Sequence, residues 1–380
     1  MKILLLYYYP PCPSGLATQG QLLHRGLEEI GVEVHAAHYE SEQEKEWYYR
    51  WFRPDVVVGI GYWGHVPELV LHPQRYGLRP VPWLVADGYM ADYQEVLDRL
   101  PLVLVTSRWV GSVYARDGLS GRNIEVLPVG CDTDRFLPRA RDDPKVAAVR
   151  TLLGVGPDEI MILTVGGDAT SKGAQEVMRA LAQIQGKTPA WKYVCKVWPQ
   201  ARTDRQNSMD LELAAQLGIE KNVIFATNIT SRDFMPYLLA ACDIYAAPSR
   251  LEGFGMLQVE ANACGKPVIS IRAMGLLDTM VHGETAFLAE VAEEIRVTET
   301  VVGGGPGGQG GRRVVFASPR VVDYRASVAD IAHYLFRLMQ DTELRCRMGQ
   351  AGRQRAVENY HYRTVAQQFA GTVRTRLGIA

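Results

Sequence analysis

The sequence predicts an α/β protein in which two doubly wound parallel sheets follow one another along the chain. Short apolar runs alternate with amphipathic segments, a pattern typical of parallel strands that are covered by helices. This alternation stops at a polar stretch, residues 138–144, and then starts again. The chain has 380 residues, which is more than one hydrophobic core usually holds, so two domains are expected.

The first half of the chain supplies the elements of one sheet. The opening residues MKILLLYYYPP lack the small-residue cleavage site of a signal peptide and end in two prolines, so we expect a buried first strand there. The expected strands are residues 3–8, 34–37, 56–60, 82–85, 102–106 and 124–127, and the expected helices are 19–30 and 108–117.

The second half repeats the pattern. The expected strands are residues 160–165, 193–197, 223–226, 244–247 and 268–271, and the expected helices are 173–184, 209–217, 233–240, 328–340, 342–360 and 362–377. The segment 303–312 is rich in glycine and lacks the ending of a P-loop, which predicts a flexible surface insertion. The predicted domains are residues 1–140 and 141–360, with a C-terminal helix, 361–380, that packs back on the first domain.

Composition excludes several classes of function. The formal net charge is -1, which leaves no basic surface for nucleic acid. The six cysteines include no CxxC pair, so we expect reduced thiols, no disulfide and no structural metal. No apolar run reaches the roughly 18 residues of a transmembrane helix. We therefore expect a cytoplasmic protein without stable membrane association, and the oligomeric state stays open.

One segment, residues 248–270, carries the clearest chemical signal. Glu252 stands in a loop after a predicted strand, and Gly253 and Gly255 allow a ligand to approach the backbone closely. A helix follows, and the unpaired N–H groups at a helix start favour a diphosphate. Glu260 lies about two turns into this helix, where its carboxylate can accept a hydrogen bond from a hydroxyl group.

Glu252 and Glu260, separated by seven residues within PSRLEGFGM and EANACGKPVIS, resemble the E-x7-E signature of the glycosyl transferases group 1 family. Further matches follow in the family's order, including LTVGG at 163–167, Lys172-Gly173 and PVGCDTDRFLP at 128–138. The resemblance implies a GT-B fold, in which two Rossmann-like domains face an interdomain cleft. It also implies a metal-independent, retaining hexosyltransferase that moves a sugar from a nucleoside diphosphate to an acceptor hydroxyl, with no other cofactor. The acceptor domain would come first and the nucleotide-sugar domain second.

The resemblance also implies roles for individual residues. Glu252 would contact hydroxyls of the donor sugar, Glu260 the ribose, and Lys172 the diphosphate, whose charge grows as the glycosidic bond breaks. The catalytic candidates are Glu252, Lys172 and Asp87. The candidates for donor binding are Gly15, Gly166, Gly167, Lys172, Lys196, Asn228, Glu252, Gly253, Phe254, Gly255, Met256, Leu257 and Glu260.

Several positions depart from the family pattern, and one departure is the glycine-rich loop after the first strand, which is reduced here to Gly15. Gly167 stands where many relatives carry an arginine, and Lys196 is a candidate replacement for that cation, with a solvated lysine at a strand end as the alternative. Asp87 stands where the family often has a histidine near the donor sugar, and a simple turn residue in Asp87-Gly88 is the alternative.

Other readings of the sequence stay open at this point. Gly59, Gly61 and Gly64 form a literal GxGxxG, with Asp87 at nearly the spacing of an NAD-dependent oxidoreductase, although Pro67 and Pro73 interrupt the helix that should follow. An inactive sugar-nucleotide-binding protein is a third possibility. The DxD at 132–134 falls in a predicted turn, so it predicts no metal site. The aromatic residues crowded into the first domain favour contact with an acceptor or a partner over membrane binding.

Overall fold

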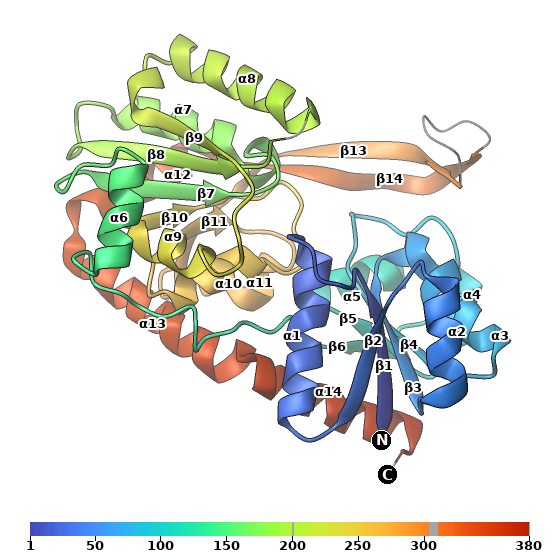
Figure 1. Cartoon of the computed structure of the whole chain (residues 1–380). Coiled ribbons are helices and arrows are strands. Elements are labelled where there is room, and N and C mark those ends of the chain that lie inside the picture. The colour runs from blue at the N-terminus through green and yellow to red at the C-terminus, as the bar shows by residue number, and fades with distance from the viewer. Residues whose placement is uncertain (200, 304–310, 380) are drawn as a thin grey trace. The chain divides into compact units, whose positions relative to one another are not determined.

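The chain forms two compact units, which the computed structural model describes over residues 1–199, 201–303 and 311–379 (Figure 1). Unit 1 comprises Met1–Gly130, Ile295–Val322 and Asn359–Ala380, and unit 2 comprises Cys131–Glu294 and Asp323–Glu358. Each unit contains one six-stranded parallel sheet. The sequence-based domain ranges 1–140, 141–360 and 361–380 stay a prediction.

The sheet of unit 1 has the strand order β2-β1-β3-β4-β5-β6. Its strands are β1 (Lys2–Tyr7), β2 (Glu33–His38), β3 (Val56–Gly61), β4 (Pro80–Leu84), β5 (Val103–Val105) and β6 (Ile124–Val126). Ile3 pairs in register with Val34 on one side and with Val56 on the other. All six predicted strands are confirmed, and those that are buried on both faces, such as β3, appear in the sequence as continuous apolar runs.

The helices of unit 1 are α1 (Gly15–Glu29), α2 (Glu42–Trp51), α3 (His72–Arg75), α4 (Gln94–Asp98), α5 (Arg108–Arg116) and α14 (Tyr362–Leu377), with short turns η1 (Trp63–His65) and η2 (Pro67–Leu71). The last helix packs against the first. A side chain at Gly26 would lie 2.7 Å from Ala366 Cβ, so glycine permits this close approach. The Tyr362 hydroxyl donates to Glu29 Oε2 at 2.8 Å.

The sheet of unit 2 has the order β12-β11-β10-β7-β8-β9. Its strands are β7 (Ile160–Val165), β8 (Trp191–Val197), β9 (Val223–Thr227), β10 (Ile244–Ala246), β11 (Val268–Ile271) and β12 (Ala286–Ala289). Its helices are α6 (Pro144–Leu152), α7 (Ala174–Ile184), α8 (Ala201–Gln216), α9 (Met235–Ala241), α10 (Met256–Ala263), α11 (Leu276–Thr279), α12 (Val328–Gln340) and α13 (Thr342–Tyr360), with turns η3 (Thr170–Lys172) and η4 (Glu220–Asn222). The five strands predicted here are confirmed, and β12 was not predicted.

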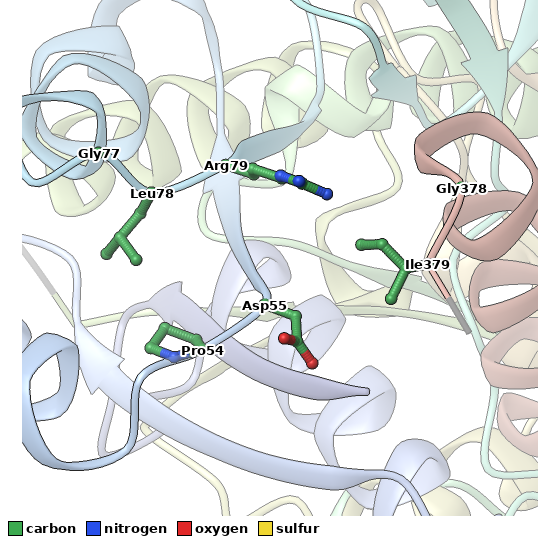
Figure 2. A pocket seen from close by; sticks show the side chains of 7 residues that line it. All are labelled: Pro54, Asp55, Gly77, Leu78, Arg79, Gly378 and Ile379. Atoms are coloured by element: carbon green, nitrogen blue, oxygen red, sulfur yellow. The ribbon is translucent and has the colours of Figure 1, made fainter.

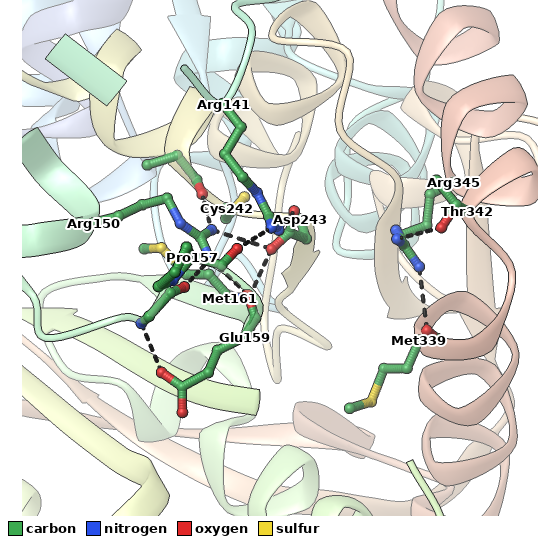
Figure 3. A network of polar contacts seen from close by, with 12 residues as sticks. Arg141, Arg150, Pro157, Glu159, Met161, Cys242, Asp243, Met339, Thr342 and Arg345 are labelled. Atoms are coloured by element: carbon green, nitrogen blue, oxygen red, sulfur yellow. Dashed lines mark hydrogen bonds and ion pairs between the residues drawn. The ribbon is translucent and has the colours of Figure 1, made fainter. Parts of the chain in front are cut away.

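A buried polar network ties α6 to the sheet of unit 2 (Figure 3). Arg150, which is 4% exposed, donates to Asp243 Oδ2 at 3.2 Å and to backbone carbonyls of Ala241, Gly156 and Glu159. Asp243 also accepts from the Met161 N–H at 2.8 Å. Because each buried charge finds hydrogen-bonding partners, the network holds α6 against the ends of β7 and β10.

A long β-hairpin interrupts the second half of the chain (Figure 1, orange). Its strands are β13 (Val291–Val302) and β14 (Arg312–Ala326), and the sequence analysis predicted neither. The chain passes from unit 2 into unit 1 within β13 and returns within β14. Most of the glycine-rich segment, residues 304–310, lies outside the described residues, so its flexibility stays a prediction.

Candidate functional site

The carboxyl edge of the unit 2 sheet has a topological switch point beside β7. The chain runs from β7 to β8 and β9 on one side, and β10 then returns to the other side of β7. In open α/β sheets, ligands bind outside the carboxyl ends of the strands at such a point. A ligand-binding site is therefore expected among the residues that follow β7 and β10.

Lys172 and Glu252 follow these two strands and form an ion pair. Lys172 Nζ lies 2.8 Å from Glu252 Oε2, and the two side chains are 23% and 17% exposed. Two glycines leave room for the contact between Lys172 and Glu252. Gly173 has φ 81, and a side chain there would lie 2.4 Å from the Pro248 carbonyl oxygen. A side chain at Gly166 would lie 2.8 Å from Lys172 Cγ, so the lysine stem passes directly over the end of β7.

The start of α10 completes this group. Gly255, with φ 92, is the N-cap residue, and no side chain caps the helix. The Gly255 N–H donates to Glu252 Oε1 at 3.1 Å, which fixes the carboxylate beside the helix start. Phe254 is buried, whereas Met256 and Leu257 are partly exposed in the first turn. The uncapped amides of that turn and the helix dipole are suited to an anion.

Glu260, farther along α10, is held by an arginine that the sequence analysis missed. Arg232 pairs with both carboxylate oxygens of Glu260, one of them at 3.1 Å. The Glu260 side chain is 2% exposed, and the guanidinium of Arg232 stacks over the Phe136 ring at 4.8 Å. Arg232 lies in the loop before α9, and no local motif marks it.

The remaining residues predicted for unit 2 lie at the ends of β7, β8 and β9. Lys196 is 4% exposed, and its ammonium donates to the carbonyls of Val197 and Asn228. Burial lowers the pKa of Lys196. The carbonyl of Gly167 accepts from the Trp198 N–H at 3.0 Å, and a side chain at Gly167 would meet the Trp198 ring only at ordinary contact distance, 3.5 Å. Nothing in the structure therefore requires glycine at position 167.

Two of the predicted site residues belong to unit 1. Gly15 is the first residue of α1, and the Ser14 hydroxyl caps that helix by accepting from the Ala17 N–H at 3.1 Å. Asp87 follows β4 and is exposed, although the protein that surrounds its carboxyl group raises its pKa by desolvation. How these two residues lie relative to Lys172 and Glu252 stays a prediction.

The GxGxxG motif has a packing role. Gly59 and Gly61 lie inside β3, and a side chain at Gly59 would be 2.5 Å from Leu69 Cβ. The chain then continues into the short turns η1 and η2. A dinucleotide fingerprint needs its glycines in the turn between a strand and a long helix, so the NAD-dependent reading of this motif is wrong.

A cavity of about 390 Å³ opens at the amino ends of β3 and β4 (Figure 2). Its lining residues are Pro54, Asp55, Gly77, Leu78, Arg79, Gly378 and Ile379. Because ligands of doubly wound sheets bind at the opposite, carboxyl edge, this cavity is a poor candidate for the main site. Across the described residues, every helix is too short or too polar to cross a bilayer.

Comparison with known proteins agrees with this geometry. Residues 150–301 match the family model described as glycosyl transferases group 1. Over this segment the chain is similar to the glycosyl transferases group 1 family. The match includes β7, Lys172, Glu252 and Glu260, so the family segment contains the whole unit 2 group described above.

Two curated relatives illustrate the similarity. The chain is 27% identical over 277 residues to the GDP-mannose-dependent alpha-(1-6)-phosphatidylinositol monomannoside mannosyltransferase of Mycolicibacterium smegmatis, covering 71% of this chain and 61% of that protein. It is 32% identical to the D-inositol 3-phosphate glycosyltransferase of Salinispora arenicola, covering 53% and 45%. The matched part spans less than two thirds of either relative.

Solved structures confirm the predicted fold class, GT-B. HepE of Anabaena, in complex with UDP and glucose, covers 99% of this chain with a TM-score of 0.75 at 17% identity. Sucrose-phosphate synthase of Thermosynechococcus elongatus covers 100% with a TM-score of 0.77 at 16% identity. At such low identity, these structures establish the fold alone.

Proposed function

We propose that the protein is a retaining glycosyltransferase that moves a hexosyl group from a nucleoside-diphosphate sugar to an acceptor hydroxyl, without a metal ion. The observation that carries this proposal is the Lys172–Glu252 pair beside the uncapped start of α10, at the switch point of the unit 2 sheet. One cation, one carboxylate and a set of free amides are what a diphosphate and the sugar attached to it require.

The proposed reaction exchanges one bond for another at the anomeric carbon. The bond from that carbon to the diphosphate oxygen breaks, and a bond to the acceptor oxygen forms on the same face of the sugar. The acceptor proton passes to a phosphate oxygen of the leaving group, so no separate base is needed. Negative charge accumulates on the leaving diphosphate, and Lys172 with the first-turn amides of α10 stabilises it.

When the donor binds, each residue of the ion pair contacts a different part of the donor. The Lys172 ammonium turns from Glu252 to the diphosphate, which carries the larger negative charge. Glu252, still anchored by the Gly255 N–H, is then able to accept hydrogen bonds from hydroxyls of the sugar. Glu260, oriented by Arg232, accepts from the ribose.

We assign Asp87 and Gly15 of the first domain to the donor sugar and the edge of the site, and Gly166, Gly167, Lys196, Asn228, Gly253, Phe254, Met256 and Leu257 to the nucleotide. We also place the reaction in the reducing cytoplasm, because all six cysteines are unpaired thiols. A UDP- or GDP-linked hexose is the proposed donor, since relatives and solved homologues are named for GDP-mannose and UDP-glucose.

A ligand panel tests the proposal. Thermal unfolding is measured with UDP, GDP, ADP and their hexose conjugates, because a ligand that binds the native state raises the melting temperature. The best donor is then incubated with a pool of hydroxyl acceptors, and release of the nucleoside diphosphate is followed. Stabilisation together with release supports the enzyme. Stabilisation without release over hours supports instead a binding protein that has lost activity, for which Gly167 in place of the expected arginine is the motivating observation.

A further inference from the structure

The carboxyl edge of the unit 1 sheet carries two tyrosines that stand between two acidic residues. Within three residues of the ends of β2, β1, β3 and β4 stand, in sheet order, Glu40, Tyr8, Tyr62 and Asp87. We name these four residues the aromatic–acidic edge. Neighbouring strands lie about 4.8 Å apart, so the edge extends over about 14 Å. That length suits a short oligosaccharide better than a single sugar ring.

Contacts between rings fix the aromatic part of this edge. The Tyr8 ring packs edge-on against Tyr39 at 5.0 Å, Tyr39 lies 4.9 Å from His65, and His65 lies 4.2 Å from Tyr62. Tyr39 is buried, whereas Tyr8 and Tyr62 are only partly buried, so part of their surface is open to a ligand. The Tyr39 hydroxyl donates to Glu40 Oε1 at 2.9 Å, which holds that carboxylate next to the rings.

The β13–β14 hairpin holds the other end of the edge. The Tyr89 hydroxyl is hydrogen-bonded to Thr300 Oγ1 at 2.9 Å, and the Tyr89 ring packs on Phe316 at 5.1 Å. A side chain at Gly88, which has φ 88, would lie 2.4 Å from the Val321 carbonyl oxygen, so the hairpin backbone closes directly over this turn. The hairpin thereby positions Asp87, the residue before Gly88.

The hairpin itself is fixed by a buried ion pair. Arg320 of β14 lies 2.8 Å from Asp117 Oδ1, and the two side chains are 9% and 2% exposed. Val302, Val314 and Phe316 pack against the core of unit 1. With both apolar packing and a buried charge pair, this part of the hairpin is an integral part of unit 1.

Each end of the edge carries a carboxylate, Glu40 at one end and Asp87 at the other. Burial first, and then the neighbouring Asp87 and Tyr8, raise the pKa of the Tyr62 phenol. Carboxylates accept hydrogen bonds from sugar hydroxyls but repel phosphate groups. Aromatic faces pack well against the C–H groups of sugar rings, because the face of the ring is electron-rich.

We infer that the aromatic–acidic edge binds a neutral oligosaccharide as the acceptor, with sugar rings on Tyr8 and Tyr62 and hydroxyls donated to Glu40, while Asp87, at the far end of the edge, keeps its assignment to the donor sugar. This inference rests on the proposed glycosyl transfer and adds the class of its acceptor. It predicts that the enzyme discriminates against acceptors that carry a phosphate group.

The experiment compares acceptors and variants in the whole 380-residue chain. The donor is whichever of UDP-glucose and GDP-mannose the enzyme consumes. Transfer is measured to three neutral trisaccharides, maltotriose, cellotriose and mannotriose, and to two phosphorylated sugars, glucose 6-phosphate and mannose 6-phosphate. We expect transfer to at least one trisaccharide and little to the phosphates. Y62A should raise the KM for the trisaccharide about tenfold, as for the loss of one stacking contact, whereas Y62F, which keeps the ring, should stay within about twofold.

Two controls separate this inference from the proposed function. W47A removes an aromatic side chain that is 56% exposed on α2. We expect the KM of this variant for the trisaccharide to equal that of the wild type. The affinity of Y62A for the nucleoside diphosphate should match that of the wild type, because that ligand is assigned to unit 2. Preference for a phosphorylated acceptor, no binding of any trisaccharide in the presence of the nucleoside diphosphate, or an unchanged KM in Y62A would overturn the inference. Loss of nucleotide binding or of donor consumption in the wild type would instead overturn the proposed function.

Discussion

The substitution K172A is expected to lower kcat about a hundredfold. The Lys172 ammonium lies within 2.8 Å of Glu252 Oε2 and is 23% exposed, so solvent screens it only in part. For a site of this kind, an effective dielectric constant of about 20 gives about 4 kcal/mol between unit charges 4 Å apart. The desolvation of the ammonium reduces this gain to about 3 kcal/mol, and each 1.4 kcal/mol corresponds to about a tenfold change in rate.

The assay is steady-state release of the nucleoside diphosphate at saturating donor and acceptor. K187A serves as the matched control, because Lys187 is an exposed lysine that follows α7 and its ammonium lies 3.5 Å from the Gln183 carbonyl oxygen. K172R keeps the positive charge and should recover part of the rate. If K172A turns over within threefold of the wild type while K187A is also unchanged, Lys172 does not stabilise the leaving group, and the reasoning is refuted.

Three further outcomes follow from other contacts. R232A leaves the Glu260 carboxylate, which is 2% exposed, without its guanidinium partner. This variant should raise the KM for the donor more than it lowers kcat, whereas an unchanged KM would show that Glu260 does not bind the donor. D243A leaves the guanidinium of Arg150 buried without its carboxylate, and should lower the free energy of unfolding by about 3 kcal/mol in urea titrations, against no loss for the exposed control D158A. Hydrogen bonds and salt bridges, first from Arg363, lower the pKa of Glu29 from 4.5 to about 2. The stabilising contribution of Glu29 is therefore complete above pH 4.5 and is lost as the pH falls toward 2. Over this range the melting temperature should fall less steeply with decreasing pH for E29Q than for the wild type, and equal slopes would contradict a stabilising role of the Glu29 carboxylate.

The central strands of both sheets could be predicted because of their burial. A central parallel strand such as β7 is covered on both faces and is therefore apolar at every position except Thr164. The hairpin strands were missed for the opposite reason. Most positions of β13 are exposed, and half of them carry charged or polar residues. No apolar run therefore marks this strand, and only the weak alternation of branched residues beside a glycine-rich segment could have indicated a hairpin.

The site was predictable where its chemistry is local in the sequence. Glu252, the glycines around it and the start of α10 form one continuous segment, so the resemblance of that segment to the family signature was enough to mark them. Arg232 could not be found in this way, because it meets Glu260 from a loop that precedes another helix. The pairing of Lys172 with Glu252 likewise depends on β7 and β10 becoming neighbours in the sheet, which a sequence pattern does not specify.

A crystal structure of the protein with UDP or GDP, whichever stabilises it more, tests the central claim most directly. The account predicts that the diphosphate lies within hydrogen-bonding distance of Lys172 Nζ and of the first-turn amides of α10, with the ribose at Glu260. A diphosphate bound elsewhere on the chain, with the Lys172–Glu252 pair undisturbed, would contradict it.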